Sequence, residues 1–91
     1  MTTQEANKII TDLLKLKTLT QIKLAIGETE DSCIESKESI YEFDTRKSRK
    51  CIWVWHKTAS FLEWENSIEG GEYDPDAVIV LTNDELVVNR V

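Results

Sequence analysis

Cys51 and His56 have the most reactive side chains in the chain, and they lie five positions apart in the stretch Lys50–His56. A thiol beside an imidazole is the arrangement of a cysteine nucleophile and its general base. The stretch reads as a β-strand, however, and side chains along a strand alternate between the two faces of a sheet. The odd separation therefore puts Cys51 and His56 on opposite faces. We expect both cysteines, Cys33 included, to behave as small hydrophobic residues, and we predict no catalytic residues.

Two turns carry side-chain oxygens that could hold a cation, Asp74-Pro75-Asp76 and Asn83-Asp84-Glu85. Neither has the glycine and distal glutamate of a calcium loop. Gly70-Gly71 lacks the lysine of a phosphate-binding loop and fits the end of a helix instead. The sequence therefore predicts no metal site and no cofactor.

A basic cluster stands out between two acidic segments, at the tip of a predicted hairpin. A tip of this kind could contact phosphate, so a nucleic-acid-associated regulatory domain is our alternative hypothesis. The net charge of -6 opposes the spread phosphate contacts that give nucleic-acid binding most of its affinity. We therefore favour a solvated turn. The cluster consists of Arg46, Lys47, Arg49 and Lys50.

Aromatic residues and carboxylates supply the candidate partner-binding site. Burying an indole ring stabilises a small domain strongly, so we expect at least two of the three tryptophans in the core. A small domain has limited interior, and a tryptophan left at the surface among charges resembles an interface hot spot. The candidates for partner binding are Trp53, Trp55, Trp64, Glu30, Asp31, Glu35, Glu65, Tyr73 and Asp74.

Composition indicates one small acidic domain over residues 1–91. The chain has 41% hydrophobic residues, enough for a single modest core. Its 17 acidic residues against 11 basic ones disfavour anionic partners and favour a basic protein. We expect a cytoplasmic protein, because the cysteines are few, the first residues do not resemble a signal peptide, and no apolar run has membrane-spanning length.

Apolar periodicity predicts two helices. Residues 3–17 place apolar side chains at three- and four-residue steps, with Thr2 and Glu5 as a capping box. Residues 60–69 show the same spacing, with Ser60 and Glu63 as a second capping box and Gly70-Gly71 as the stop.

Alternating or continuous apolar stretches predict about five strands. The first stretch is ambiguous, because Thr18 and Gly27 could equally cap a short helix. We choose a strand there because Ile22, Leu24 and Ile26 alternate with Lys23 and Ala25. Residues 28–38 read as a loop. The expected strands are 21–26, 39–44, 50–56, 77–81 and 86–91.

The order of elements predicts an α+β fold, with a small antiparallel sheet of about five strands and both helices packed on one face. Strands 39–44 and 50–56 should form one hairpin, and strands 77–81 and 86–91 a second. The last strand should lie at a sheet edge, where it could pair with a second copy to form a homodimer.

The absence of a catalytic, metal or nucleotide signature directs the functional hypothesis towards binding. We expect a small acidic protein-binding module that acts by surface complementarity on a more basic protein, as an inhibitor, immunity protein or phage-type antagonist does. We expect no membrane partner, and an enzyme is the hypothesis we rank last.

Overall fold

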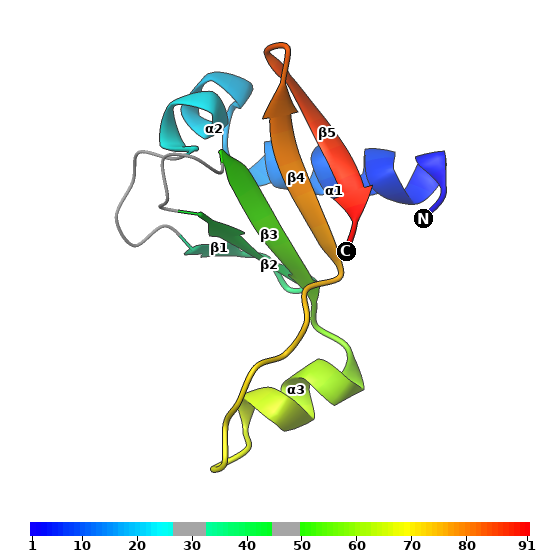
Figure 1. Cartoon of the computed structure of the whole chain (residues 1–91), viewed down its shortest axis with the longest axis vertical. Coiled ribbons are helices and arrows are strands. Elements are labelled where there is room, and N and C mark those ends of the chain that lie inside the picture. Colours follow the sequence, from blue (N-terminus) through cyan, green and yellow to red (C-terminus); the bar gives the residue numbers. More distant parts are fainter. Residues whose placement is uncertain (27–32, 45–49) are drawn as a thin grey trace.

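The computed structural model describes residues 1–26, 33–44 and 50–91, and over these ranges the chain forms three helices and a five-stranded antiparallel sheet (Figure 1). The predicted α+β class is therefore confirmed. The strands are neighbours in the sheet in chain order, from β1 to β5. The elements are α1 (Thr3–Leu16), α2 (Leu19–Ala25), β1 (Cys33–Glu35), β2 (Ser39–Phe43), β3 (Cys51–His56), α3 (Ala59–Glu65), β4 (Ala77–Thr82) and β5 (Glu85–Arg90).

Helix α1 forms where its apolar spacing predicts it. The hydroxyl of Thr2 accepts a hydrogen bond from the Glu5 N–H at 3.1 Å, which satisfies one of the unpaired amides of the first turn. Ile9 and Leu13, four residues apart, are buried against the sheet. This part of the predicted amphipathic face packs, whereas Leu14 and Leu16 farther along the helix are exposed.

The strand predicted at 21–26 is wrong, because this segment is helix α2. Thr18 and Gln21 form a full capping box: the Thr18 hydroxyl accepts from the Gln21 N–H at 3.2 Å, and the Gln21 side chain accepts from the Thr18 N–H at 3.0 Å. Ile22, Ala25 and Ile26 are buried at helical spacing, whereas Leu24 is 66% exposed. In a helix this short, the apolar residues happen to alternate as they would in a strand.

Strand β1 is the second correction, since it lies within the segment predicted to be a loop. It pairs antiparallel with β2, with Cys33 opposite Glu42 and Glu35 opposite Ile40. The connection is tight, because the Ser36 hydroxyl accepts from the Ser39 N–H at 3.1 Å. A three-residue strand is too short to show an alternating pattern. The number of strands matches the prediction because β1 replaces the strand wrongly expected at 21–26.

Both predicted hairpins are confirmed. Strands β2 and β3 pair from Ser39 opposite His56 to Phe43 opposite Ile52. Strands β4 and β5 are joined by Asn83 and Asp84, whose φ angles of 50° and 66° suit a tight two-residue hairpin turn. The tip between β2 and β3, residues 45–49, lies outside the described residues. Strand β5 is at a sheet edge, and pairing with a second copy stays a prediction.

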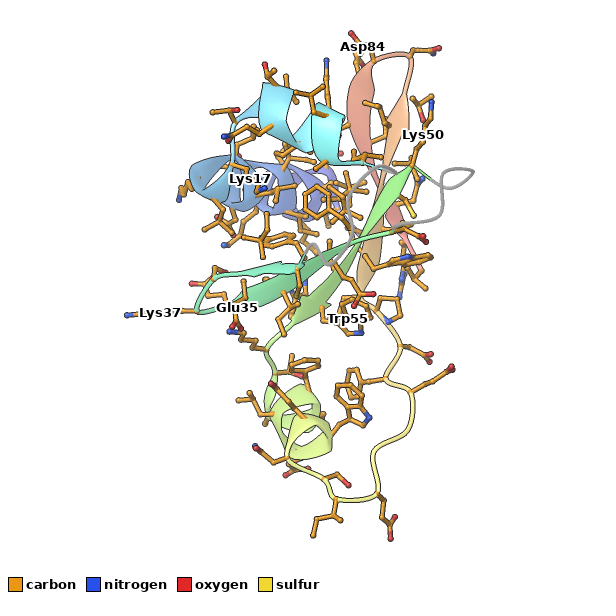
Figure 2. The ribbon with its side chains drawn as sticks, turned by 90° about the vertical axis from the view of Figure 1, so that its left-hand side faces the viewer. Lys17, Glu35, Lys37, Lys50, Trp55 and Asp84 are labelled. Atoms are coloured by element: carbon orange, nitrogen blue, oxygen red, sulfur yellow. The ribbon has the colours of Figure 1, made fainter. Side chains whose placement is uncertain are left out.

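One face of the sheet carries the core. Helices α1 and α2 lie together on this face (Figures 1 and 2), and their buried residues contact those of the strands. The core cluster consists of Ile9, Leu13, Ile22, Ala25, Ile26, Tyr41, Phe43, Ile52, Val54, Ala77 and Ile79. The other face is not covered by a helix in the described part of the chain, and we call it the open face.

Helix α3 differs from its prediction in length, cap and position. It ends at Glu65 rather than at residue 69, and its N-cap is Thr58, whose hydroxyl accepts from the Phe61 N–H at 3.2 Å. Ile68, an apolar residue within the predicted range 60–69, is fully exposed. The helix lies beyond one end of the sheet instead of packing beside α1 (Figure 1). Its contacts are with the segment that returns to β4.

Candidate binding groove on the open face

Aromatic side chains from three segments meet in one open groove. Strand β3 supplies Trp53 and Trp55, helix α3 supplies Trp64, and the segment before β4 supplies Tyr73. The groove holds about 400 Å³ and is wide open to solvent. We call it the aromatic groove. The described residues that line it are Glu42, Trp53, Trp55, Trp64, Glu72, Tyr73, Asp74 and Pro75.

Strand geometry sets the positions of Trp53 and Trp55. They are two residues apart, so both point to the open face, about 7 Å from each other along the strand. Trp53 lies between its cross-strand partners, Glu42 on β2 and Val78 on β4. Trp55 is opposite Ile40 and lies near the end of the sheet that is closer to α3 (Figure 2).

Two lining residues, Trp64 and Tyr73, form an aromatic trio with Phe61. The ring centroids of Phe61, Trp64 and Tyr73 are 5.4 to 5.5 Å apart, and Tyr73 meets Phe61 edge-on at 87°. Such pairs contribute about 0.5 to 1.5 kcal/mol each beyond their buried area. Phe61 is buried, whereas the other two rings are partly exposed. The trio holds α3 and the returning segment together.

Every indole N–H in the groove is bonded within the protein. Trp55 donates to the main-chain oxygen of Tyr73 at 2.8 Å, Trp64 to that of Gly71 at 3.1 Å, and Trp53 to the Asp44 carboxylate at 3.1 Å. These bonds fix the ring orientations. The surface that the indoles offer to a ligand is therefore their carbon edges and π-faces.

The charge of the groove is negative. Glu42, Glu72 and Asp74 are exposed along it, and no lysine or arginine occurs among its described lining residues. Within the described part of the chain, none of the three carboxylates forms a salt bridge with a basic side chain. The groove thus combines electron-rich rings with carboxylates that are available to a cation.

Comparison with known proteins does not identify the function of the groove. Neither protein families, curated proteins nor solved structures match this chain. The groove therefore has to be interpreted from its own geometry and chemistry.

All three tryptophans are partly exposed, which corrects the expectation that at least two belong to the core. The core face is filled by aliphatic side chains together with Tyr41 and Phe43, all packed beneath α1 and α2. The indoles of Trp53 and Trp55 point to the other face, and Trp64 is on the helix beyond the sheet. Alternation indicated that Trp53 and Trp55 share a face, but it did not indicate which face is open.

The structure brings together five of the predicted partner-binding residues: Trp53, Trp55, Trp64, Tyr73 and Asp74. Glu65 is exposed on α3 but does not line the groove. Glu35 is on β1, where its carboxylate pairs with Lys57 at 2.8 Å. Glu30 and Asp31, like Arg46, Lys47 and Arg49, lie outside the described residues. Lys50 is exposed directly before β3.

Glu42, Glu72 and Pro75 also line the groove, although they are not among the predicted partner-binding residues. Glu42 could have been found, because the predicted hairpin of β2 and β3 already implies a carboxylate opposite Trp53. Glu72 and Pro75 had no such signal, since their positions depend on how the irregular segment after α3 folds back.

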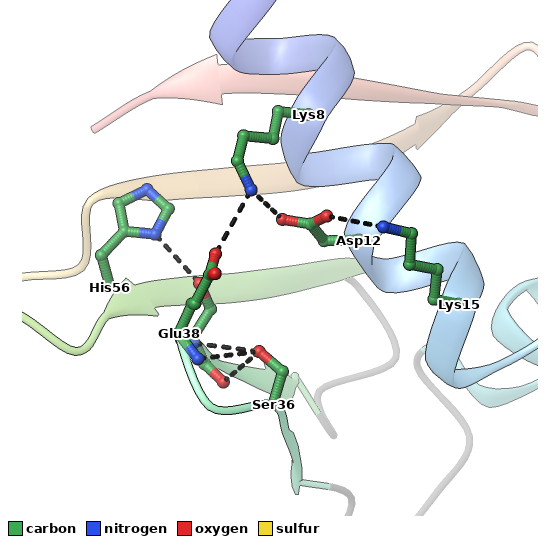
Figure 3. A network of polar contacts seen from close by, with 7 residues as sticks. Lys8, Asp12, Lys15, Ser36, Glu38 and His56 are labelled. Carbon is green, nitrogen blue, oxygen red and sulfur yellow. Dashed lines mark hydrogen bonds and ion pairs between the residues drawn. The ribbon is translucent and has the colours of Figure 1, made fainter.

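A second polar cluster joins α1 to the turn before β2 (Figure 3). The ammonium of Lys8 contacts the carboxylates of Asp12 at 2.6 Å and Glu38 at 3.3 Å, and Lys15 approaches Asp12 at 3.8 Å. The hydrogen bond from Lys8 lowers the pKa of Asp12, and the bond to Asp12 raises the pKa of Lys8. These surface contacts tie the helix to the sheet.

His56 is hydrogen-bonded beside this cluster, with Nδ1 3.1 Å from the Ser39 hydroxyl. Ser39 is buried, so its hydroxyl is not presented to a substrate. The nearby Asp76 accepts from the main-chain N–H of His56 at 2.7 Å and not from its ring. The pair connects the ends of β2 and β3 and lacks the geometry of a catalytic triad.

The reactive residues singled out in the sequence are separated, as the alternation predicts. Cys51 is on the open face, where its thiol lies 3.8 Å from the Asp44 carboxylate, and His56 is on the core face. Neither cysteine is in a disulfide. In the described part of the chain, no three His, Cys, Asp or Glu side chains are placed so that they could hold one metal ion. No helix in residues 1–26, 33–44 and 50–91 has the length and apolarity for a membrane crossing.

Proposed function

We propose that the chain is a protein-binding module whose aromatic groove binds a basic segment of another protein. One observation carries the proposal: four partly exposed aromatic side chains share a groove with three carboxylates that no described basic side chain neutralises. Fixed aromatic rings surrounded by charge resemble interface hot spots, where few residues supply most of the binding energy.

The acidic side chains and the aromatic rings contribute to different steps of binding. The net charge of -6 attracts a basic surface over several ångströms and increases the association rate. The aromatic rings then exclude water and slow dissociation. A module of this kind acts by occupying a basic surface of its target, as an inhibitor, immunity protein or phage-type antagonist does.

Selection from a library of short random peptides displayed on phage tests the proposal. The protein is the bait, and the folded double variant Trp53→Ala/Trp55→Ala is the counter-selection bait. We expect the peptides that are kept by the protein and lost by the variant to be enriched in lysine and arginine. Val87→Ala, which trims another exposed side chain on the open face, is the matched control and should keep the same peptides.

Two results would contradict the proposal. The first is a set of selected peptides with no excess of basic residues. The second is a basic set that the double variant binds equally well, which would move the binding surface away from the groove. Circular dichroism in the near ultraviolet and urea denaturation establish that the variants are folded before they are compared.

A further inference from the structure

We propose that the aromatic groove recognises the guanidinium group of an arginine side chain in the partner. This inference rests on the proposed function and narrows it from basic segments in general to one side chain. It follows from the hydrogen-bonding groups of the groove, from its shape and from the rigidity of its rings.

The groove offers acceptors and very few donors. The carboxylates of Glu42, Glu72 and Asp74 accept hydrogen bonds only, and the three indole N–H groups are already engaged. Among the described side chains, the Tyr73 hydroxyl is the one donor left. A phosphate or carboxylate ligand would meet three like charges and a single side-chain donor. The complementary ligand is a cation that brings several N–H donors of its own.

The shape of the groove distinguishes between cations. A methylated ammonium is held best when aromatic rings enclose it on several sides. Here Trp64 and Tyr73 pack on each other, Trp53 and Trp55 are spaced along a strand, and the groove is open. A guanidinium is planar, so it can stack on one indole face while its N–H groups point in the ring plane towards a carboxylate. It is also less strongly hydrated than a lysine ammonium, so bringing it onto the rings costs less.

The rings are held in place before a ligand arrives. Each indole is bonded to a main-chain oxygen or, for Trp53, to Asp44, which is only 7% exposed. Binding therefore orders few additional side chains, and this preorganisation favours even a small ligand group. Glu42, directly opposite Trp53, is the carboxylate best placed to pair with a guanidinium stacked on that ring.

Matched short peptides test the inference. They share glycine and serine flanks and differ at one central residue, which is arginine, lysine or citrulline, the uncharged isostere of arginine. Binding is followed by tryptophan fluorescence and by the NMR signals of the three indole N–H groups. We expect the arginine peptide to bind about tenfold more tightly than the citrulline peptide and at least about threefold more tightly than the lysine peptide.

Charge variants locate the contact. Glu42→Gln should weaken the arginine peptide by about three- to tenfold and leave the citrulline peptide unchanged. Glu65→Gln removes the same charge from α3 outside the groove, so it is the matched control and should change neither affinity. Both residues are exposed, so both variants should fold.

The outcomes separate this inference from the proposed function. Equal binding of arginine and lysine peptides, both tighter than citrulline, would overturn the arginine preference and leave the basic-segment proposal standing. Equal binding of arginine and citrulline, or an equal effect of the two glutamine variants, would overturn guanidinium recognition in the groove. Absence of arginine-peptide binding would also overturn guanidinium recognition. The library selection would then decide whether the proposed function fails as well.

Discussion

Trp55 donates its indole N–H to the main-chain oxygen of Tyr73 at 2.8 Å, and this bond joins the central strand β3 to the segment that returns from α3. The two walls of the aromatic groove are thereby linked across 18 positions of sequence. The groove is part of the folded architecture, and its shape does not depend on a bound partner.

Replacing Trp55 by phenylalanine should lower the free energy of unfolding by about 1 kcal/mol. The change keeps an aromatic ring but removes the hydrogen bond to Tyr73, and a net hydrogen bond contributes about that much. Trp64→Phe is the matched control, because its lost bond to Gly71 is exposed and should matter less. Urea denaturation measures both. Equal stability of Trp55→Phe and the wild-type protein would contradict a structural role for the bond.

Two substitutions in α2 distinguish the helix from the strand that the sequence favoured. Ile22→Ala should cost about 2 to 5 kcal/mol, because Ile22 is completely buried. Leu24→Ala should cost less than about 0.5 kcal/mol, because Leu24 is 66% exposed. In a strand both side chains would share one face. Comparable losses measured by denaturation would therefore support the strand.

Tyr41 predicts a loss of stability in alkali. Burial raises the pKa of Tyr41, which is 1% exposed, above that of tyrosine in the unfolded chain. The stability contributed by the protonated Tyr41 side chain is therefore fully present below about pH 10. It is lost as the pH rises through the pKa that Tyr41 has in the folded protein. The slope it adds is at most about 1.4 kcal/mol per pH unit. Tyr41→Phe should abolish that part of the slope in denaturation curves, and an unchanged slope would contradict it.

Salt should slow association with a basic peptide obtained from the selection. Raising the ionic strength from about 0.01 M to about 0.15 M shortens the range of the acidic field and should lower the association rate by up to about tenfold. The dissociation rate, which depends on aromatic contacts, should change little. Stopped-flow tryptophan fluorescence measures both rates. A constant association rate would rule out electrostatic steering.

The exposed edge of β5 predicts self-association at high concentration. Unpaired backbone groups on an edge strand can pair with those of a second copy, which would extend the sheet through a two-fold axis. Light scattering over a concentration series should show the mass rising towards that of a dimer. A monomeric mass throughout would exclude the edge-strand homodimer.

The sequence predicted those elements in which one pattern dominates. Ile9 and Leu13 repeat at helical spacing and lie where expected, and β2 with β3 forms the expected hairpin. The segment with Ile22, Leu24 and Ile26 fits both periods over a few residues, and only the Thr18 capping box, formed with Gln21, decides between them. Short elements therefore depend on end signals more than on their apolar pattern.

The sequence predicted several residues of the groove but not that they would lie together. The tryptophans, Tyr73 and Asp74 were all candidates, yet their meeting depends on the fold of residues 66–76, an irregular stretch without periodicity. Glu35 was a reasonable acidic candidate, but it pairs with Lys57 instead. The spacing of residues along the chain does not predict tertiary contacts of this kind.

The strand order also bears on how the chain folds. Because each strand pairs with the next one along the sequence, most pairings close short loops, which keeps their entropic cost low and favours rapid folding. The exception is the long excursion between β3 and β4, which contains α3. Contacts among the rings of Phe61, Trp64 and Tyr73 close a smaller loop within this segment. This lowers the entropic cost of bringing β4 to β3. Trp64 and Tyr73, which line the groove proposed to hold a partner's arginine, would thus also help β4 to reach the sheet.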